Sequence, residues 1–279
     1  YDLMVYDNGS CPEVLEFLQA ELAAERIQWL WLSGGNMKKI GAWNQIFGAA
    51  QSDYVYYFDC DILHREGWFE DCMRVFETFP EAGMVNAAPV PAMAPEKREL
   101  VLSTTLRMLE ESDDVRLEKG YFTEDAWFRE FGESLGSDPD TFLAKARRFE
   151  QVKATRNGVE VFAQAWHAQF LAKTEILAQF FPQSADWAQE SRDHDFDRFL
   201  NDCPCLRLGV ASPRVAHLGN SITENYRREL EGLLDDESAE ARLVRREGGW
   251  RSQMMRLPFV RKLVLRLHAL TFSLIYNAK

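Results

Sequence analysis

Long apolar stretches, paired cysteines and basic charge are all scarce in this sequence of 279 residues. No window of about 18 apolar residues is free of charge, so the sequence predicts no transmembrane helix. The five cysteines show no repeated CxxC spacing with accompanying histidines, which argues against a disulfide framework or a zinc site. This cysteine usage favours a reducing compartment, and we expect a cytoplasmic protein.

Basic charge is scarce overall but is concentrated in one segment. The chain has 44 acidic and 32 basic residues, a formal net charge of −12, which argues against a nucleic-acid partner. Residues 242–279 contain nine basic residues and one acidic residue, so the remainder is strongly acidic. The hydrophobic content of 46% is that of a globular protein, long enough for one large α/β domain or two small ones.

The first 90 residues alternate predicted strands with predicted helices. Helices are expected from about residues 12, 38 and 66. Apolar runs predict strands at residues 3–6, 27–32, 54–58 and 84–85. Strands separated by helices of this length imply right-handed crossovers and a mainly parallel sheet.

The second half of the chain has a different pattern. Residues 95–155 are rich in charge and helix formers, so we expect a helical insertion. Arg156-Asn157-Gly158 is typical of a hairpin turn before a strand at residues 159–165. A last strand with its loop is expected at residues 208–217, and helices over most of the rest.

Two carboxylates, Asp59 and Asp61, come directly after the apolar residues 54–58. Open α/β sheets bind ligands at the carboxyl ends of their parallel strands. Carboxylates one residue apart can share a divalent cation whose other ligands are phosphate oxygens. A D-x-D by itself is more often only an acidic strand exit, so its context decides the interpretation.

The context is an ordered set of three motifs: Asp7-Asn8-Gly9-Ser10, then Gly35-Asn36 with Gly41 and Asn44, then Asp59-Cys60-Asp61. This succession resembles the GT-A nucleotide-sugar glycosyltransferases of the family 2 type, clearly over residues 1–90 and more weakly over 159–221. The resemblance implies a Rossmann-like α/β fold with a mainly parallel central sheet and flanking helices. The family's first strand and helix are missing before the first motif, so we expect the domain to begin upstream of Tyr1.

The resemblance also assigns roles to single residues. Asp7 contacts the nucleoside, and a metal ion, Mn²⁺ or Mg²⁺, is held on the donor diphosphate by the D-x-D and, in many such enzymes, by a later histidine. The predicted donor-binding residues are Asp7, Asn8, Gly35, Asn36, Lys39, Asn44 and Asp59, and the predicted metal ligands are Asp59, Asp61 and His217. Two alternatives stay open: His217 as a structural histidine bonded to backbone, and solvation of Lys38 or Lys39 on a helix face.

The predicted general base lies in the acidic stretch of residues 190–197. Placing Phe196 on the family's apolar position makes Asp193 the base, and a shift of two residues makes Asp195 the base; we prefer Asp193. The alternative is that these acids only cap a helix N-terminus, where acidic residues are stabilising. Nearby, Trp166 and His167 resemble the acceptor-facing segment, although a core aromatic is the usual role of such a tryptophan.

These inferences predict two parts. Residues 1–222 are expected to form a GT-A domain, with a nucleotide-sugar half (1–90), the insertion (95–155) and an acceptor half (156–222). Residues 223–279 are expected to form a basic helical segment that contacts either an anionic membrane surface, at the inner face, or protein.

The implied activity is metal-dependent, inverting transfer of a sugar from a nucleotide diphosphate sugar to a hydroxyl of a glycan, lipid-linked or protein acceptor, as in polysaccharide biosynthesis. The alternatives are a sugar-nucleotide nucleotidyltransferase and a noncatalytic GT-A-like module that binds a glycan or a partner.

Overall fold

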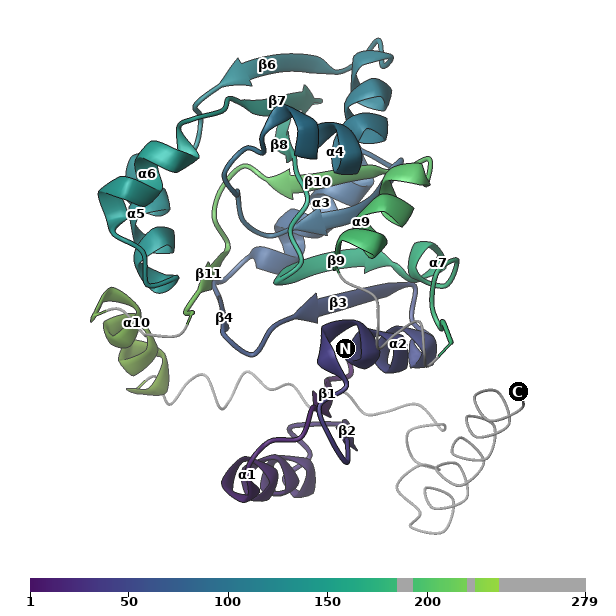
Figure 1. The fold of residues 1–279 in the computed structure, drawn as a ribbon, viewed down its shortest axis with the longest axis vertical. Coiled ribbons are helices and arrows are strands. Elements are labelled where there is room, and N and C mark those ends of the chain that lie inside the picture. The colour runs from purple at the N-terminus through teal and green to yellow at the C-terminus, as the bar shows by residue number, and fades with distance from the viewer. Residues whose placement is uncertain (185–192, 220–223, 236–279) are drawn as a thin grey trace. The chain divides into compact units, whose positions relative to one another are not determined.

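The computed structural model describes residues 1–184, 193–219 and 224–235, and its centre is a seven-stranded sheet with the order β3-β9-β5-β10-β8-β7-β6 (Figure 1). Its strands are β3 (Tyr54–Phe58), β5 (Ala82–Asn86), β6 (Arg116–Gly120), β7 (Gln151–Arg156), β8 (Val159–Ala163), β9 (Gln169–Lys173) and β10 (Leu206–Val210). Helices cover this sheet, which confirms the predicted α/β class.

Two small sheets accompany the large one. β1 (Met4–Asp7) pairs in parallel with β2 (Trp29–Leu32). β4 (Ile62–His64), which directly follows the D-x-D, pairs antiparallel with β11 (Val215–His217). This second pairing brings the loop after β3 next to a segment about 150 residues later in the chain.

Helices α4 and α9 pack against each other in front of the sheet, and α3 lies behind it (Figure 1). α2 contributes Ile40, Trp43 and Phe47 to a core cluster of the described residues, and α9 contributes Phe196 and Leu200 to the same cluster. The helices are α1 (Pro12–Ala23), α2 (Lys38–Ala49), α3 (Trp68–Thr78), α4 (Pro95–Glu110), α5 (Asp125–Ser134), α6 (Pro139–Ala146), α7 (Thr174–Leu177), α9 (Asp193–Asp202) and α10 (Glu224–Asp235).

The expectation of a mainly parallel sheet is wrong: most neighbouring strands of the seven-stranded sheet pair antiparallel. In the seven-stranded sheet only β5 and β10 pair in parallel. β9 lies antiparallel between β3 and β5, and β8, β7 and β6 continue antiparallel from β10. The early strands do alternate with helices, but β9 from the second half of the chain inserts between two of them, which alternation alone does not reveal.

The insertion is not purely helical. α4, α5 and α6 form as helices, but residues 116–120 and 151–156 are strands β6 and β7, paired antiparallel. β7 has mostly alternating burial, with Val152, Ala154 and Arg156 buried between half-buried neighbours. Charged residues on these strands pair across the sheet surface, as Lys153 does with Glu160 at 2.8 Å, so a composition typical of helix also suits a solvated sheet face.

The predicted hairpin turn is confirmed. β7 and β8 pair antiparallel around Asn157 and Gly158, which have φ of 49° and 79°. Positive φ at two successive turn residues is the conformation that the Asn-Gly pair favours.

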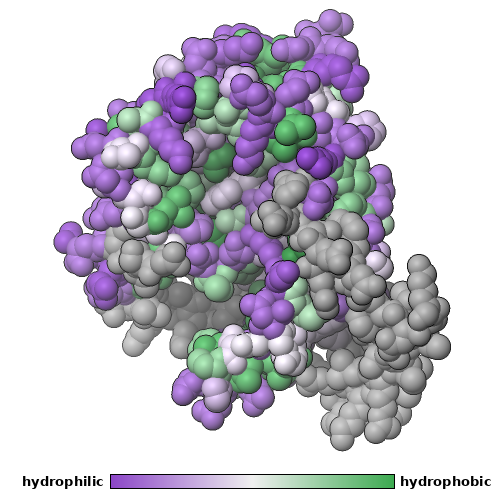
Figure 2. Space-filling view, viewed as in Figure 1, coloured by the Kyte–Doolittle hydropathy of each residue, from purple (hydrophilic) through white to green (hydrophobic). Residues whose placement is uncertain are grey.

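The β1–α1–β2 part has little core of its own. No side chain of α1 is buried, and Phe17 is 61% exposed. Figure 2 shows apolar residues at the surface of this region, toward the lower end of the view. The donor motif that follows β1 therefore depends on loop contacts more than on a packed helix beneath it.

The chain divides into two units, residues 1–223 and 224–279, and in the second unit the structure describes only α10. Of the predicted basic helical segment of residues 223–279, the structure describes α10 as a helix, and residues 236–279 lie outside the described residues. Among the helices of the described ranges, none has the length and apolar character needed to span a membrane.

Candidate functional site

Asp7 ends β1 and closes the turn that follows it. Its carboxylate accepts hydrogen bonds from the backbone N–H groups of Gly9 (3.1 Å) and Ser10 (3.2 Å). Burial by itself raises the pKa of Asp7, but hydrogen bonds from Ser10 and Gly9 outweigh burial and leave the pKa below its ordinary value. The residue predicted to contact the nucleoside is therefore ionised at neutral pH.

Asn8 and Gly9 join this turn to the start of α2. The Asn8 side chain accepts a hydrogen bond from the Met37 N–H (2.6 Å) and donates one to the Lys38 carbonyl (3.2 Å). Gly9 has a φ of 90°, and a Cβ there would lie 3.3 Å from the carbonyl carbon of Gly35. The turn after β1 and the loop before α2 thus lie side by side. Their backbones are so close at Gly9 that a side chain there would crowd Gly35, which favours glycine at position 9.

The loop before α2 has open space beside its backbone. A Cβ added at Gly34 or Gly35 would meet none of the described atoms within 4 Å. The Asn36 side chain accepts a hydrogen bond from the Lys38 N–H (2.7 Å) and fixes the entry into the helix. The Met37 and Lys38 N–H groups at this helix start are thus both satisfied by side chains, while space remains open beside the Gly34–Gly35 backbone.

Lys39 and Asp59 form an ion pair at the end of β3. The Lys39 ammonium lies 2.9 Å from the Asp59 carboxylate and 5.3 Å from the centre of the Trp43 ring. The Tyr57 hydroxyl donates to the same carboxylate. The Asp59 N–H donates to the Ala168 carbonyl (2.8 Å), which joins this strand end to the segment before β9.

Asn44 serves the packing of the protein in this structure. It is 2% exposed, and its side-chain amide donates to the Gln183 carbonyl (3.0 Å) and accepts from the Gln183 N–H (2.5 Å). These two bonds attach the segment after α7 to α2. The predicted role of Asn44 in the donor pocket stays a prediction.

Asp61 and His217 are brought together by the β4–β11 pairing. His217 Nε2 lies 3.5 Å from Asp61 Oδ2, and the Leu218 N–H donates to the Asp61 carbonyl (2.7 Å). The other polar atoms of both side chains, Asp61 Oδ1 and His217 Nδ1, are buried and have no hydrogen-bond partner among the described residues. A buried oxygen or nitrogen atom without a hydrogen-bond partner destabilises the folded protein, unless a bound ligand supplies the missing interaction.

This pair fits a divalent cation, because carboxylate oxygen and imidazole nitrogen are both ligands of Mn²⁺. The third predicted ligand, Asp59, pairs through its carboxylate with Lys39 and Tyr57. Over the described ranges, no three His, Cys, Asp or Glu side chains gather with metal-ligand spacing. Of the predicted set, Asp61 and His217 lie together, and Asp59 lies beside them in an ion pair with Lys39.

The insertion forms one wall beside this pair. The Phe131 ring of α5 meets the His217 ring edge-on at 5.8 Å and the Trp166 ring at 5.9 Å. A Cβ added at Gly219, which has a φ of 64°, would lie 1.8 Å from the Ser134 carbonyl oxygen at the end of α5. The candidate ligand His217 is therefore packed directly against the insertion.

The candidate base segment starts α9. Asp193 is its first residue, and the Asp193 side chain lies outside the described part. Asp195 is partly exposed. The next acid of this stretch, Asp197, is 5% exposed and bonds to His167 Nε2 (2.8 Å) and to the Arg207 guanidinium (2.5 Å).

The Asp197 cluster was not predicted from the sequence, in which Asp197 stands only as one of several acids that can cap a helix. Burial raises the pKa of Asp197, but the hydrogen bond from His167 and the charge of Arg207 outweigh it and lower the pKa to about 2. Arg207 was a usable signal: an arginine inside the apolar run of residues 206–210 needs a buried carboxylate partner.

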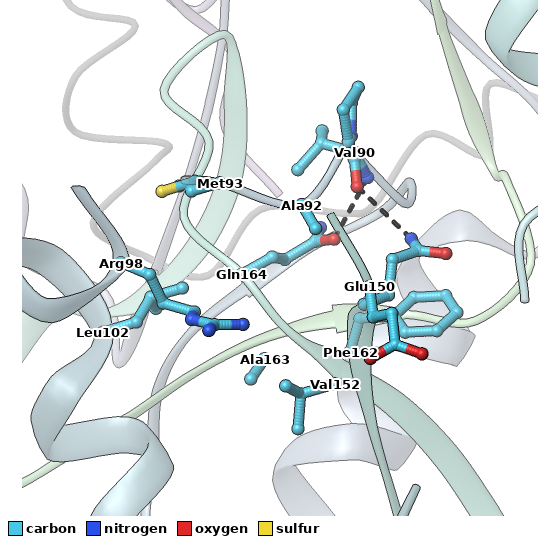
Figure 3. Close-up of a pocket in the computed structure, with 12 residues that line it drawn as sticks. Val90, Ala92, Met93, Arg98, Leu102, Glu150, Val152, Phe162, Ala163 and Gln164 are labelled. Atoms are coloured by element: carbon cyan, nitrogen blue, oxygen red, sulfur yellow. Dashed lines mark hydrogen bonds between the residues drawn. The ribbon is translucent and has the colours of Figure 1, made fainter. Parts of the chain in front are cut away.

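One hollow of the surface lies apart from these residues. It is lined by Met93, Leu102, Val152 and Phe162 and has Arg98 and Glu150 on its walls (Figure 3). Its floor is fixed by Gln164, which accepts a hydrogen bond from the Val90 N–H (3.1 Å). Among the described residues that line this hollow there is no predicted donor, metal or base residue, so it is not assigned to the donor.

Residues 1–127 match the family model of the glycosyl transferase family 2. The match includes the turn after β1, the loop before α2 and the D-x-D, which are the motifs on which the predicted resemblance depends. It confirms that resemblance and, with the α/β architecture, the GT-A type of fold. No curated protein matches the chain.

Proposed function

We propose that this protein carries out a metal-assisted, inverting transfer of a sugar to an acceptor hydroxyl. The premise is the family 2 glycosyltransferase domain of residues 1–127, since such a domain uses a nucleotide-sugar donor and an acceptor. The observation that supports it best is the Asp61–His217 pair, with its two unsatisfied buried atoms, at the exit of β3. Asp59 and Lys39 lie at the same exit, so groups for a diphosphate and a cation occur together.

In the proposed reaction the acceptor hydroxyl oxygen attacks the anomeric carbon from the side opposite the diphosphate. The bond from this carbon to the diphosphate oxygen breaks, and the nucleoside diphosphate leaves with the electron pair. The hydroxyl proton passes to a carboxylate at the start of α9, for which we prefer Asp193 over Asp195. Asp7 would orient the nucleoside, and Lys39 would stabilise the diphosphate.

Asp61 and His217 would hold the Mn²⁺ or Mg²⁺ ion. The bound cation would supply electrostatic stabilisation of the charge that develops on the leaving diphosphate. Asp59, which is committed to Lys39, would keep that lysine beside the diphosphate in place of coordinating the ion.

The class of the acceptor belongs to the proposal as well. We favour a glycan, lipid-linked or protein-linked hydroxyl, in polysaccharide or related biosynthesis, with the protein in the cytoplasm and the basic segment of residues 242–279 at the inner face of a membrane. The charge of that segment is the support for this location.

The proposal is tested first by a thermal-shift screen of UDP-, GDP-, CMP- and dTDP-sugars, each with and without Mn²⁺. A ligand of the native state at a hundredfold excess over its Kd stabilises it by about 2.7 kcal/mol, which such a screen resolves. Release of the nucleotide product is then measured for the donor that binds. Synthesis of a sugar nucleotide from a sugar phosphate would favour the nucleotidyltransferase, and binding without turnover would favour the noncatalytic module.

The metal assignment is tested by Asp61→Asn, which keeps the shape of the side chain and removes its charge. We expect kcat/KM for transfer to fall by about 100-fold and the stabilisation by Mn²⁺ to disappear. Asp140→Asn is the matched control, because Asp140 lies on the insertion surface with a side chain 81% exposed. Unchanged activity and Mn²⁺ binding in Asp61→Asn would remove the assignment.

A further inference from the structure

A buried set of three polar side chains joins three elements of the fold near the candidate site. Asp197 on α9 accepts hydrogen bonds from His167 Nε2 (2.8 Å) and from the Arg207 guanidinium (2.5 Å) on β10. Arg207 is completely buried and also donates to the Val101 carbonyl of α4 (3.1 Å). Because the carboxylate accepts from His167, the imidazole carries its proton on Nε2.

The charge of Asp197 is already balanced by Arg207, so the hydrogen bond from His167 is not needed to compensate that charge. A buried arginine and aspartate form a complete ion pair by themselves. His167 belongs to neither helix α9 nor strand β10: it lies in the segment before β9, and its side chain is 17% exposed. Its bond to Asp197 therefore attaches that segment to α9.

Both ends of this attachment lead to the candidate site. The residue after His167, Ala168, accepts the hydrogen bond from the Asp59 N–H (2.8 Å) at the end of β3. Asp197 lies one helical turn after Asp193, the first residue of α9. Trp43 fills the space between, with its ring edge-on to His167 (5.9 Å) and to Phe196 (5.4 Å).

We propose that His167 is a positioning residue: its hydrogen bond to Asp197 sets the start of α9, and hence the acceptor-activating carboxylate, relative to the donor-side exit of β3. This inference rests on the proposed function. Misplacement of a reacting group by about 1 Å can cost a factor of about 100 in rate, so a contact that fixes two elements relative to each other has a kinetic effect.

The test compares two substitutions of similar size. Gln at position 167 retains an amide N–H that can donate to Asp197, whereas Leu does not. We expect His167→Leu to lower kcat for transfer by about 10- to 100-fold with little change in the KM for the donor, and His167→Gln to recover most of kcat. Binding of UDP, GDP, CMP or dTDP, whichever stabilises the unmodified chain, is expected to stay unchanged in both.

Asn201→Ala is the matched control at the opposite end of α9. Its side chain accepts from the Thr104 N–H (3.2 Å) and donates to the Ser103 hydroxyl (2.9 Å) of α4. We expect this variant to lose stability without a selective loss of kcat. Equal kcat in His167→Leu and the unmodified chain, or an equal loss in Asn201→Ala, would overturn the positioning role.

Hydrogen exchange of α9 separates failure of this inference from failure of the proposed function. We expect the amides of residues 196–202 to exchange faster in His167→Leu than in His167→Gln, whether or not any donor is turned over. If the unmodified chain transfers no sugar, the proposed function fails, and the exchange result still decides whether His167 holds α9. Identical exchange in the two variants would refute the attachment.

Discussion

Asp197 is a buried carboxylate whose neighbours favour its charged form more strongly than burial opposes it. Its pKa of about 2 in the folded protein lies below the value of about 3.9 expected for an unfolded chain. A lowered folded-state pKa contributes stability that is complete above pH 4 and is lost as the pH falls toward 2. We expect the free energy of unfolding to fall by about 2 kcal/mol over that interval through this group.

Asp197→Asn should therefore destabilise the protein and reduce this acid dependence. Removing one partner of a buried ion pair costs about 3–5 kcal/mol at neutral pH, because Arg207 is left uncompensated. Urea denaturation at pH 7 and at pH 3 measures both effects, and Asp140→Asn on the exposed Arg129 pair is expected to cost less than about 1 kcal/mol. If the two variants lose equal stability, Arg207 is neutralised by some other group.

Helix α9 depends on aromatic residues for its position. Phe196 is fully buried in the core cluster, whereas Phe199 is only partly buried at its edge. We expect Phe196→Ala to lower the free energy of unfolding by about 3–5 kcal/mol and Phe199→Ala by clearly less. Chemical denaturation of both variants checks this order, and a reversed order would contradict the placement of α9 against α2.

The elements that could be predicted are those whose signal is local. Apolar runs located β1, β2, β3 and β5, and Asn157-Gly158 located the β7–β8 turn because positive φ restricts residue type. β6 and β7 escaped prediction because their surface charges resemble those of a helix. The place of β9 between β3 and β5 is a long-range pairing, which no local pattern encodes.

The candidate site divides in the same way. Residue types and their order were enough to select Asp7, Asn8, Asp59 and Asp61, which lie on one chain segment matched by the family model. Asp59 pairs with Lys39, and Asp61 pairs with His217. Which partner each carboxylate contacts depends on the direction of its side chain at the end of β3. The Asp197 cluster joins residues up to 40 positions apart, so its partners become visible only in the fold.

At the scale of the whole molecule, the charge is unevenly distributed between an acidic body and the basic segment of residues 242–279. A basic amphipathic segment binds anionic lipid with about 1 kcal/mol for each charge near the surface. We expect the full chain to float with vesicles that contain anionic lipid and a chain ending at Asp236 to remain in solution.

A full chain with reduced positive charge is the control for this flotation assay. Replacing Arg256, Arg261 and Lys262 by Glu retains the length of the segment and leaves it with six basic and four acidic residues in place of nine and one. We expect this variant to lose flotation on anionic vesicles. Added salt, which screens the same charges, is expected to reduce flotation of the unmodified chain. Equal flotation of all three chains would refute a membrane role and favour docking of the segment on protein.

The contact between Gly219 and the Ser134 carbonyl has an evolutionary consequence. No side chain fits at position 219 unless α5 moves, and α5 carries Phe131, which packs on His217. A lineage can therefore place a larger residue at position 219 only if its α5 is displaced from this position. We expect position 219 and the α5 sequence to vary together among homologues, so that a larger residue at 219 accompanies an insertion of different geometry.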